Sequence, residues 1–518
     1  MINLSRFCML SFGNLRSIGC SNAKRYFCSP TKLLPDSLIN RFVDHLSPNW
    51  KLEESLQNNK IPSLIVHKFS GVLFGKGFDS NVKDLERECL KVVEISDSKK
   101  LYEILDVLIR YLPEWITKLK FYELAIVRLM KEIEMNPQKD DFVKLCFYVG
   151  LWKKNKTGVI YMNSLIIKYL DDILRNQNVT TIDFAIICTA TFKASVKIVS
   201  PEFTKRLLSE IEETNDIDRF IFVAFIKSLR HNRIQSLKVI DKLKELQKNG
   251  QLEKLQFGAL VHIFPLVADT CYKDESLNNF FISNCMRTLD KEARAKDIGK
   301  LLWCCSHLNL KLDLKDLKKL EEFTITRTKS VEFKKKFDHF VDVALSLWNL
   351  NFHSIQLLRI LVKDQRFTIT GDKNRIKLDS RKRLLLTCAE IEEPKKLKSL
   401  NIRSKSFSES NPAPRYLLKA SLDRVMRILR NNGIQDAQFV QQIKNLNIAG
   451  IFVNHKGIKN HIEVLDSTNL LSDNSTCNGI FALKLRLLQK MNCKVTLVSS
   501  GYNIFNKSVC INTFSFLA

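Results

Sequence analysis

The sequence predicts a mostly α-helical protein, in which an α-solenoid of helix-pair repeats is followed by a small α/β domain. Apolar residues with helical spacing recur along most of the chain, and this recurrence stops after residue 362. Alternating apolar patterns typical of strands come only near the C-terminus. A chain of 518 residues is long enough to bury a sizeable core. We expect four segments, at residues 1–35, 36–362, 363–414 and 415–518.

The first segment, residues 1–35, has the composition of a mitochondrial transit peptide. Its arginines and lysines all precede the first acidic residue, Asp36. The stretch RYFCS also resembles a mitochondrial processing site, with cleavage after Phe27. The segment therefore predicts a location in the mitochondrial matrix. A disordered basic arm and a secretory signal built on residues 7–12 are the alternatives.

The overall composition favours a polyanionic partner. The formal net charge is +27, and basic side chains favour phosphate because each contact releases counterions. No apolar run is long enough for a membrane-spanning helix. The 14 cysteines include no C-x-x-C pair and the histidines lack metal-ligand spacing, so we expect no metal site and no cofactor. Cysteines that we expect to be buried on helices include Cys146, Cys188, Cys285 and Cys305.

The second segment, residues 36–362, carries an internal repeat. Each unit has apolar residues at i, i+3, i+4 and i+7, which mark one buried helix face, and a second amphipathic stretch follows. Only Thr191 and Lys227 interrupt these stripes. The first residues of successive stripes, 36 to 42 positions apart, are Leu101, Phe142, Phe184, Phe220, Phe257, Ile298 and Phe340. Two helices per step is the unit of an α-solenoid, which buries its apolar face by stacking on its neighbours.

This repeat is longer than a tetratricopeptide unit and lacks its signature residues. It resembles the heptatricopeptide and octotricopeptide repeats of organellar RNA-binding proteins. An irregular helical bundle with accidental spacing is the alternative.

The third segment, residues 363–414, is predicted to be a basic linker. Residues 394–414 are rich in Ser, Pro and Lys, as linkers are. The segment also carries a basic cluster, which we expect to contact phosphate, with a solvated surface as the alternative. The cluster consists of Lys373, Arg375, Lys377, Arg381, Lys382 and Arg383.

The fourth segment, residues 415–518, is predicted to be an α/β module. Two helical patterns, at 415–433 and 435–446, come first. Apolar residues then alternate on both sides of the turn-forming HKGIKN, which indicates a β-hairpin. A helix over 480–491 and a strand over 494–498 complete the order strand, strand, helix, strand.

This module resembles the RAP domain, an RNA-binding domain abundant in apicomplexan proteins. The positions that match are Glu463 in IEVLD, Gly479 at the start of a helix, Lys484, Arg486, Leu487 and Leu488 within that helix, and Lys494-Val495 at the next strand. The chain departs from the family at Asn492, where the family has Gly, and in the ending SSGYNIF. The resemblance implies a restriction-endonuclease-like fold, with structural roles for Glu463, Gly479, Leu487 and Leu488. We expect Lys484, Arg486 and Lys494 to contact RNA phosphates. An unrelated α/β cap is the alternative.

A restriction-endonuclease-like fold raises the question of catalysis. Such a site gathers two or three carboxylates and a lysine around a divalent metal ion. Glu463 and Asp466 are present, but Asn454 occupies the preceding strand and no lysine stands two residues after Glu463. Glu463 can equally well have a structural role, for example by pairing with Lys484. We therefore assign no catalytic residue.

The family resemblance implies a mitochondrial RNA-binding protein that acts in organellar RNA stability, RNA processing, or assembly of ribosomal RNA and the ribosome. Its partners would be organellar mRNA or rRNA, and mitochondrial ribosomal proteins. A structural component of the mitochondrial ribosome is the first alternative, and a metal-dependent RNA endonuclease is the second. The sequence does not indicate the particular RNA or the oligomeric state.

Overall fold

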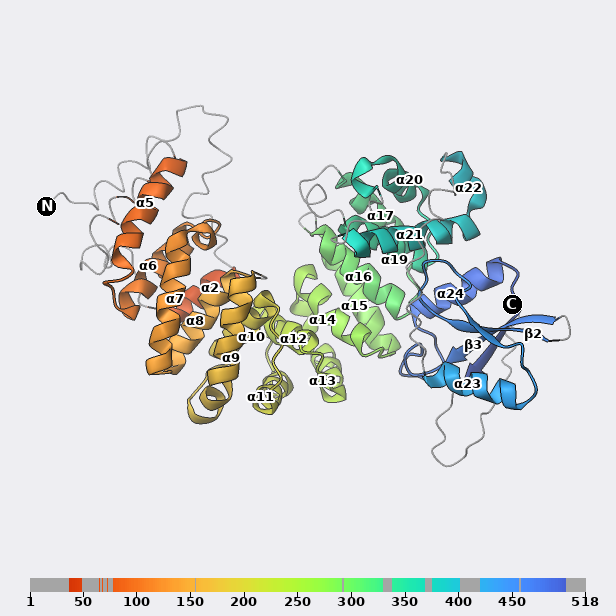
Figure 1. Ribbon diagram of the computed structural model, residues 1–518, viewed down its shortest axis with the longest axis horizontal. Coiled ribbons are helices and arrows are strands. Elements are labelled where there is room, and N and C mark those ends of the chain that lie inside the picture. The colour runs from red at the N-terminus through yellow and green to blue at the C-terminus, as the bar shows by residue number, and fades with distance from the viewer. Residues whose placement is uncertain are drawn as a thin grey trace. The chain divides into compact units, whose positions relative to one another are not determined.

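A computed structural model describes most of the chain between residues 37 and 499. The described residues are 37–48, 65, 68, 72, 78–153, 155–290, 293–328, 338–368, 375–400, 420–455 and 458–499. They are mostly helical, with a four-stranded mixed sheet near the C-terminus (Figure 1). This confirms the predicted mostly α class and the late α/β segment, whereas the predicted transit peptide lies outside the described residues. The chain divides into two compact units, residues 1–210 and 211–518.

The first unit is helical throughout its described residues. Its helices are α2 (Leu38–Leu46), α5 (Phe78–Val92), α6 (Ser98–Tyr111), α7 (Lys120–Met135), α8 (Lys139–Leu151), α9 (Lys156–Asn176), α10 (Thr181–Ala194) and most of α11 (Pro201–Glu212), with the short 3-10 helix η3 (Ile116–Lys118). The predicted stripes that start at Leu101, Phe142 and Phe184 lie on α6, α8 and α10, where all three residues are fully buried.

The packing of α8 on α10 shows how closely these helices approach. A Cβ atom added to Gly150 of α8 would lie 2.7 Å from the Cα atom of Ala190 in α10. The start of α10 is fixed by a capping box, in which Thr180 and Asp183 satisfy each other's backbone N–H groups. His45 of α2 contacts the same Asp183 carboxylate at 2.8 Å, so one acidic side chain caps α10 and holds α2.

The second unit begins with a longer series of helices. They are α12 (Arg219–His231), α13 (Leu237–Lys248), α14 (Phe257–Asp269), α15 (Glu275–Thr288), α16 (Ala295–His307), α17 (Leu314–Thr326), α19 (Asp338–Asn349), α20 (Ile355–Lys363), α21 (Ile376–Glu392) and α22 (Pro394–Ser399), with η4 (Leu252–Lys254) and η5 (Gln365–Phe367). Every second helix packs on the next one in a continuous row, from α12 through α14, α16 and α19 to α21. Phe257, Ile298 and Phe340, which start three predicted stripes, are buried in this row.

The cysteines that the sequence predicted to be buried are buried. Cys146, Cys188, Cys285 and Cys305 lie on α8, α10, α15 and α16 as free thiols. Burial raises the pKa of the Cys146 thiol and of the Cys285 thiol above its ordinary value, so both stay protonated. These side chains act as small apolar core residues.

The predicted linker is wrong for residues 376–399, which form α21 and α22. Helix α21 packs against α19, against α22 and against a later helix, α24 (Gly479–Lys490). Two of the buried residues of α21, Asp379 and Lys382, are charged, which explains why a search for apolar periodicity did not reveal the helix. Residues 401–414 of the predicted linker lie outside the described residues.

The C-terminal module combines two helices and a small sheet. In chain order it consists of α23 (Ala420–Asn431), β1 (Gln438–Val440), β2 (Gly450–His455), β3 (Ile458–Leu465), α24 and β4 (Val495–Ser499). The sheet has the order β1-β2-β3-β4; β1, β2 and β3 pair antiparallel and β4 pairs parallel to β3. The predicted hairpin, helix and strand are confirmed. The second helical pattern, 435–446, is wrong, because residues 438–440 instead form an edge strand on β2.

The two faces of this sheet are covered differently. On one face, apolar residues of the strands pack on α23 and form the core of the module, as the register Ile451↔Ile462 requires. This core contains Leu422, Val425, Met426, Ala437, Ile451, Val453, Ile462, Val464 and Val498. The residues between these core positions, such as Phe452, His461 and Glu463, lie on the other face with α24.

The N-terminus of α24 lies against the C-terminal end of α16. The side chain of Asn478 accepts a hydrogen bond from the Phe481 N–H at 3.1 Å and caps the helix. A Cβ atom added to Gly479 would lie 1.5 Å from the carbonyl oxygen of Ser306. Only glycine permits this approach, which gives a physical reason for the residue that the RAP resemblance marked as structural.

We expect Gly479→Ala to destabilise the contact between α16 and α24 by about 3 kcal/mol, because the new methyl group meets backbone that cannot move freely. Hydrogen exchange in both helices of the full chain should become faster. Gly258→Ala is the matched control, since its Cβ would meet nothing within 4 Å and alanine favours α14 by up to about 1 kcal/mol. If hydrogen exchange in α16 and α24 is equally fast in Gly479→Ala and Gly258→Ala, the close contact at Gly479 is contradicted.

Candidate nucleic-acid interface

Glu463 and Lys484 form a buried ion pair between β3 and α24. The ammonium group of Lys484 donates to Glu463 Oε2, and to the carbonyl of Ala449 at 3.2 Å. Both residues are 1% exposed. Burial raises the pKa of the Glu463 carboxyl, and the charge of Lys484 opposes that rise. A buried lysine cannot reach a phosphate, so the predicted RNA contact of Lys484 is wrong, and Glu463 forms the pair with Lys484 that its structural interpretation predicted.

Glycine makes room for this pair on the neighbouring strand. A Cβ atom at Gly450 of β2 would lie 2.5 Å from Glu463 Oε1. The carboxylate therefore occupies the space that a side chain on β2 would otherwise fill.

Arg486 points away from the sheet and joins α24 to two helices of the row. Its Nε donates to Glu392 Oε1 of α21 at 2.7 Å. Its Nη2 and Nη1 donate to the carbonyls of Trp348 and Asn349, at the end of α19, at 2.8 and 3.1 Å. The side chain of Glu392 is fully buried and also accepts from the Trp348 indole at 2.7 Å. Because the guanidinium is held by internal acceptors, the predicted phosphate contact of Arg486 is also wrong.

The basic cluster predicted in residues 373–383 does not form one surface. Lys382 is 6% exposed and donates to the carbonyls of Leu361 and Phe367 at 2.7 and 2.5 Å. Burial lowers its pKa to about 8. Lys382 thus stabilises the chain that enters α21, and its predicted phosphate contact is wrong.

Two arginines of that cluster also have partners in the protein. Arg381 forms an ion pair with Asp342 of α19, and Arg375 Nη2 donates to the carbonyl of Arg366 at 2.7 Å. The Arg381 side chain is 41% exposed, so it is still able to meet a phosphate.

The remaining predicted contacts differ in exposure. Lys377 and Lys494 are exposed and Arg383 is half-buried, whereas Lys373 lies outside the described residues. Phosphate contact by Lys377, Arg383 and Lys494 stays a prediction. Leu487 and Leu488 are fully buried on α24, in agreement with a structural role.

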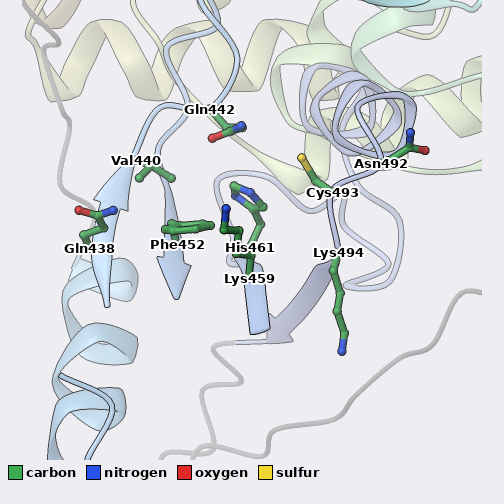
Figure 2. A pocket seen from close by; sticks show the side chains of 9 residues that line it. All are labelled: Gln438, Val440, Gln442, Phe452, Lys459, His461, Asn492, Cys493 and Lys494. Atoms are coloured by element: carbon green, nitrogen blue, oxygen red, sulfur yellow. The ribbon is translucent and has the colours of Figure 1, made fainter. Parts of the chain in front are cut away.

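The sheet face that carries α24 also bears an open groove of about 470 Å³ (Figure 2). It is lined by β1, β2, β3 and the connection from α24 to β4. None of its lining residues is acidic, two are lysines, three carry side-chain amides and one is a phenylalanine. The lining residues are Gln438, Val440, Gln442, Phe452, Lys459, His461, Asn492, Cys493 and Lys494.

His461 and Phe452 form the floor of this groove on adjacent strands. Their ring centroids are 5.1 Å apart, and Figure 2 shows Lys459 beside them on β3. Burial and the charge of Lys484 lower the pKa of His461, so its imidazole is neutral at pH 7. Its Nδ1 is buried and has no hydrogen-bond partner among the described residues.

Sequence reasoning found Lys494 but missed the rest of the groove. The available signal was the alternation within the predicted hairpin. Ile451, Val453, Ile462 and Val464 define one apolar face, so the intervening Phe452, Lys459 and His461 had to share the opposite face. An aromatic ring, a cation and an imidazole on one sheet face indicate a binding surface.

Comparison with known proteins does not assign the chain to a family, because no protein-family model and no curated protein matches it. Within the described ranges, no group of three or more His, Cys, Asp or Glu residues is placed to hold a metal ion. None of the helices in those ranges is long and apolar enough to cross a membrane.

Removing one partner of the buried pair should be far more damaging than replacing both. Lys484→Met leaves the Glu463 carboxylate buried without its cation, and we expect a loss of about 3–5 kcal/mol in the free energy of unfolding. The double variant Glu463→Leu/Lys484→Met should recover most of it. Urea unfolding followed by hydrogen exchange in β3 and α24 measures both. If the double variant is as unstable as Lys484→Met, the unpaired Glu463 carboxylate is not the cause of the lost stability.

Proposed function

We propose that the protein binds single-stranded RNA, with the groove on the C-terminal sheet as a nucleotide-binding surface. The groove carries this proposal because it combines exposed lysines, side-chain amides and an aromatic floor, with no carboxylate among its lining residues. Its volume of about 470 Å³ lies within the range of small-ligand sites, which is roughly 300–1,000 Å³.

Each kind of lining residue matches one part of a nucleotide. The ammonium groups of Lys459 and Lys494 attract phosphate, and the ring of Phe452 offers a face on which a base can stack. The amides of Gln438, Gln442 and Asn492 are able to donate to and accept from the edge of an unpaired base. Such edges are open only in single-stranded regions, which is why we propose an unpaired RNA segment.

We further propose that the row of helices is an α-solenoid and that the C-terminal module is RAP-like. Three features support this reading: alternate helices pack on one another from α12 to α21, the module has the order helix, three strands, helix, strand, and Glu463, Gly479, Leu487 and Leu488 are all buried. The net charge of +27 favours an RNA partner that contacts both the row of helices and the C-terminal module. The biological task would be mitochondrial RNA stability, RNA processing, or rRNA and ribosome assembly.

Removing both groove lysines should weaken RNA binding independently of sequence. For Lys459→Gln/Lys494→Gln we expect lower affinity for a 20-nucleotide single-stranded RNA, and a salt slope smaller by about 1.4, since each lost contact to a single strand removes about 0.7. Fluorescence anisotropy between 50 and 200 mM salt measures both. Phe452→Leu should weaken binding without changing the slope, because stacking releases no counterions.

Lys490→Gln is the matched control for these variants. Lys490 is exposed on the neighbouring helix α24 and does not line the groove, although its removal lowers the net charge as much as the loss of one groove lysine does. If it weakens binding as much as a groove lysine, the attraction is diffuse and the groove is not the site.

The proposed location has its own test. Residues 1–35 fused to a fluorescent reporter should direct it into mitochondria, because arginine-rich and acid-free segments of this kind are imported. Signal in a secretory compartment would contradict the location but not the RNA-binding surface.

A further inference from the structure

Exposed basic residues are paired on three of the helices that alternate with the row. These intervening helices are α13, α15, α17, α20 and α22, and the pairs lie on the last three. Within each pair the two residues are three or four positions apart, so their side chains are neighbours on the helix surface. The pairs are Lys315 and Lys318 on α17, Arg359 and Lys363 on α20, and Lys395 and Lys398 on α22, and all six residues are exposed.

These six cations have no acidic partner in the part of the chain that the structure describes. None of them forms an ion pair or a side-chain hydrogen bond there. Glu322 is the one exposed acid on α17, α20 and α22, and it makes no ion pair with Lys318, although it stands four residues later. Like charges on neighbouring positions of a helix repel each other and destabilise it. An anion between the members of each pair would remove this repulsion.

The other two intervening helices have a different charge pattern. Acidic residues stand among the lysines of α13, where Lys242 forms an ion pair with Glu245 at 2.9 Å and Lys244 forms one with Asp274 at 2.8 Å. The one basic residue of α15, Arg287, donates to acceptors within the protein. The surplus of exposed positive charge is therefore local to α17, α20 and α22, and does not simply follow from the net charge of the chain.

Side-chain contacts join these three helices to one another. Helix α17 packs on α20, and the hydroxyl of Ser354 at the start of α20 donates to Glu321 of α17 (Figure 1). His353, which precedes α20, contacts Glu393 at the N-cap of α22, with 3.1 Å between its Nδ1 and the carboxylate. The three cation pairs thus lie on consecutive helices that are in contact.

We propose that the three cation pairs, the basic stripe, bind phosphates along a single-stranded RNA. This inference rests on the proposed function and names the surface by which the helical region contacts the RNA, since none of the six residues lines the groove. Each phosphate contact relieves the repulsion within a pair and releases counterions. An acidic protein segment fits less well, because protein interfaces are depleted in lysine and rich in apolar side chains at their centre. On α17, α20 and α22, Leu314 is the one large apolar side chain that is exposed.

The test removes one cation pair from the full chain and leaves the groove intact. Arg359→Gln/Lys363→Gln should bind the 20-nucleotide RNA about tenfold more weakly, with a salt slope smaller by about 1.4, since each lost phosphate contact removes about 0.7. Its unfolding temperature should not fall, because the substitutions remove a repulsion. Lys238→Gln/Lys248→Gln is the matched control: it removes the same charge from exposed positions on α13, and it should bind RNA as the wild type does.

Three outcomes would overturn the basic stripe or its assignment to RNA. Equal losses of affinity in the α20 and α13 variants would mean that the attraction follows net charge alone. Unchanged affinity and salt slope in the α20 variant would exclude the stripe and leave the groove proposal standing. If a labelled polyglutamate peptide binds the wild type as tightly as the RNA does, and the α20 variant loses both equally, the stripe binds acidic protein segments instead. If the α20 variant loses RNA affinity while Lys459→Gln/Lys494→Gln does not, the stripe stands and the groove proposal fails.

Discussion

The buried ion pair between Glu463 and Lys484 fixes the position of α24, on which the rest of the C-terminal module depends. With Lys484 directed into the sheet, Arg486 on the same helix is directed to α19 and α21 and binds their buried acceptors. The N-terminus of α24 then meets α16 at Gly479, and its C-terminal end leads into the lining of the groove. Helix α24 thus has a polar anchor on each side, and the two anchors hold it on the sheet face that bears the groove.

The parts of the fold that the sequence predicted are those whose buried positions are apolar. Helices α8, α14 and α16 carry the apolar stripes that start at Phe142, Phe257 and Ile298, and the β2–β3 hairpin alternates cleanly. Helix α21 was missed because two of its buried residues, Asp379 and Lys382, are charged, and β1 was missed because its three residues depend on pairing with β2. Periodicity of apolar residues does not reveal an element whose buried positions are charged or whose formation depends on a neighbouring strand.

The candidate site was harder to predict than the fold, for a reason that concerns charge. From the sequence, any lysine or arginine can be predicted to contact phosphate. Whether its side chain points to solvent depends on tertiary contacts, which the sequence does not show. Lys484, Arg486 and Lys382 all serve as internal donors to carboxylates or carbonyls. Of the residues expected to contact RNA in the module, only Lys494 reaches the groove.

Helix α16 takes part in two packing contacts, because it lies in the row of helices and its C-terminal end contacts Gly479 of α24. Its 13 residues make it about 20 Å long, and both of its ends are fixed, by Asp297 with Arg294 at one end and by Ser306 against Gly479 at the other. It therefore connects the row of helices, of which it is a member, directly to the C-terminal module. Because α24 covers one end of a helix that the row also contains, opening of either part exposes buried surface of the other, and we expect the two to open as one cooperative unit.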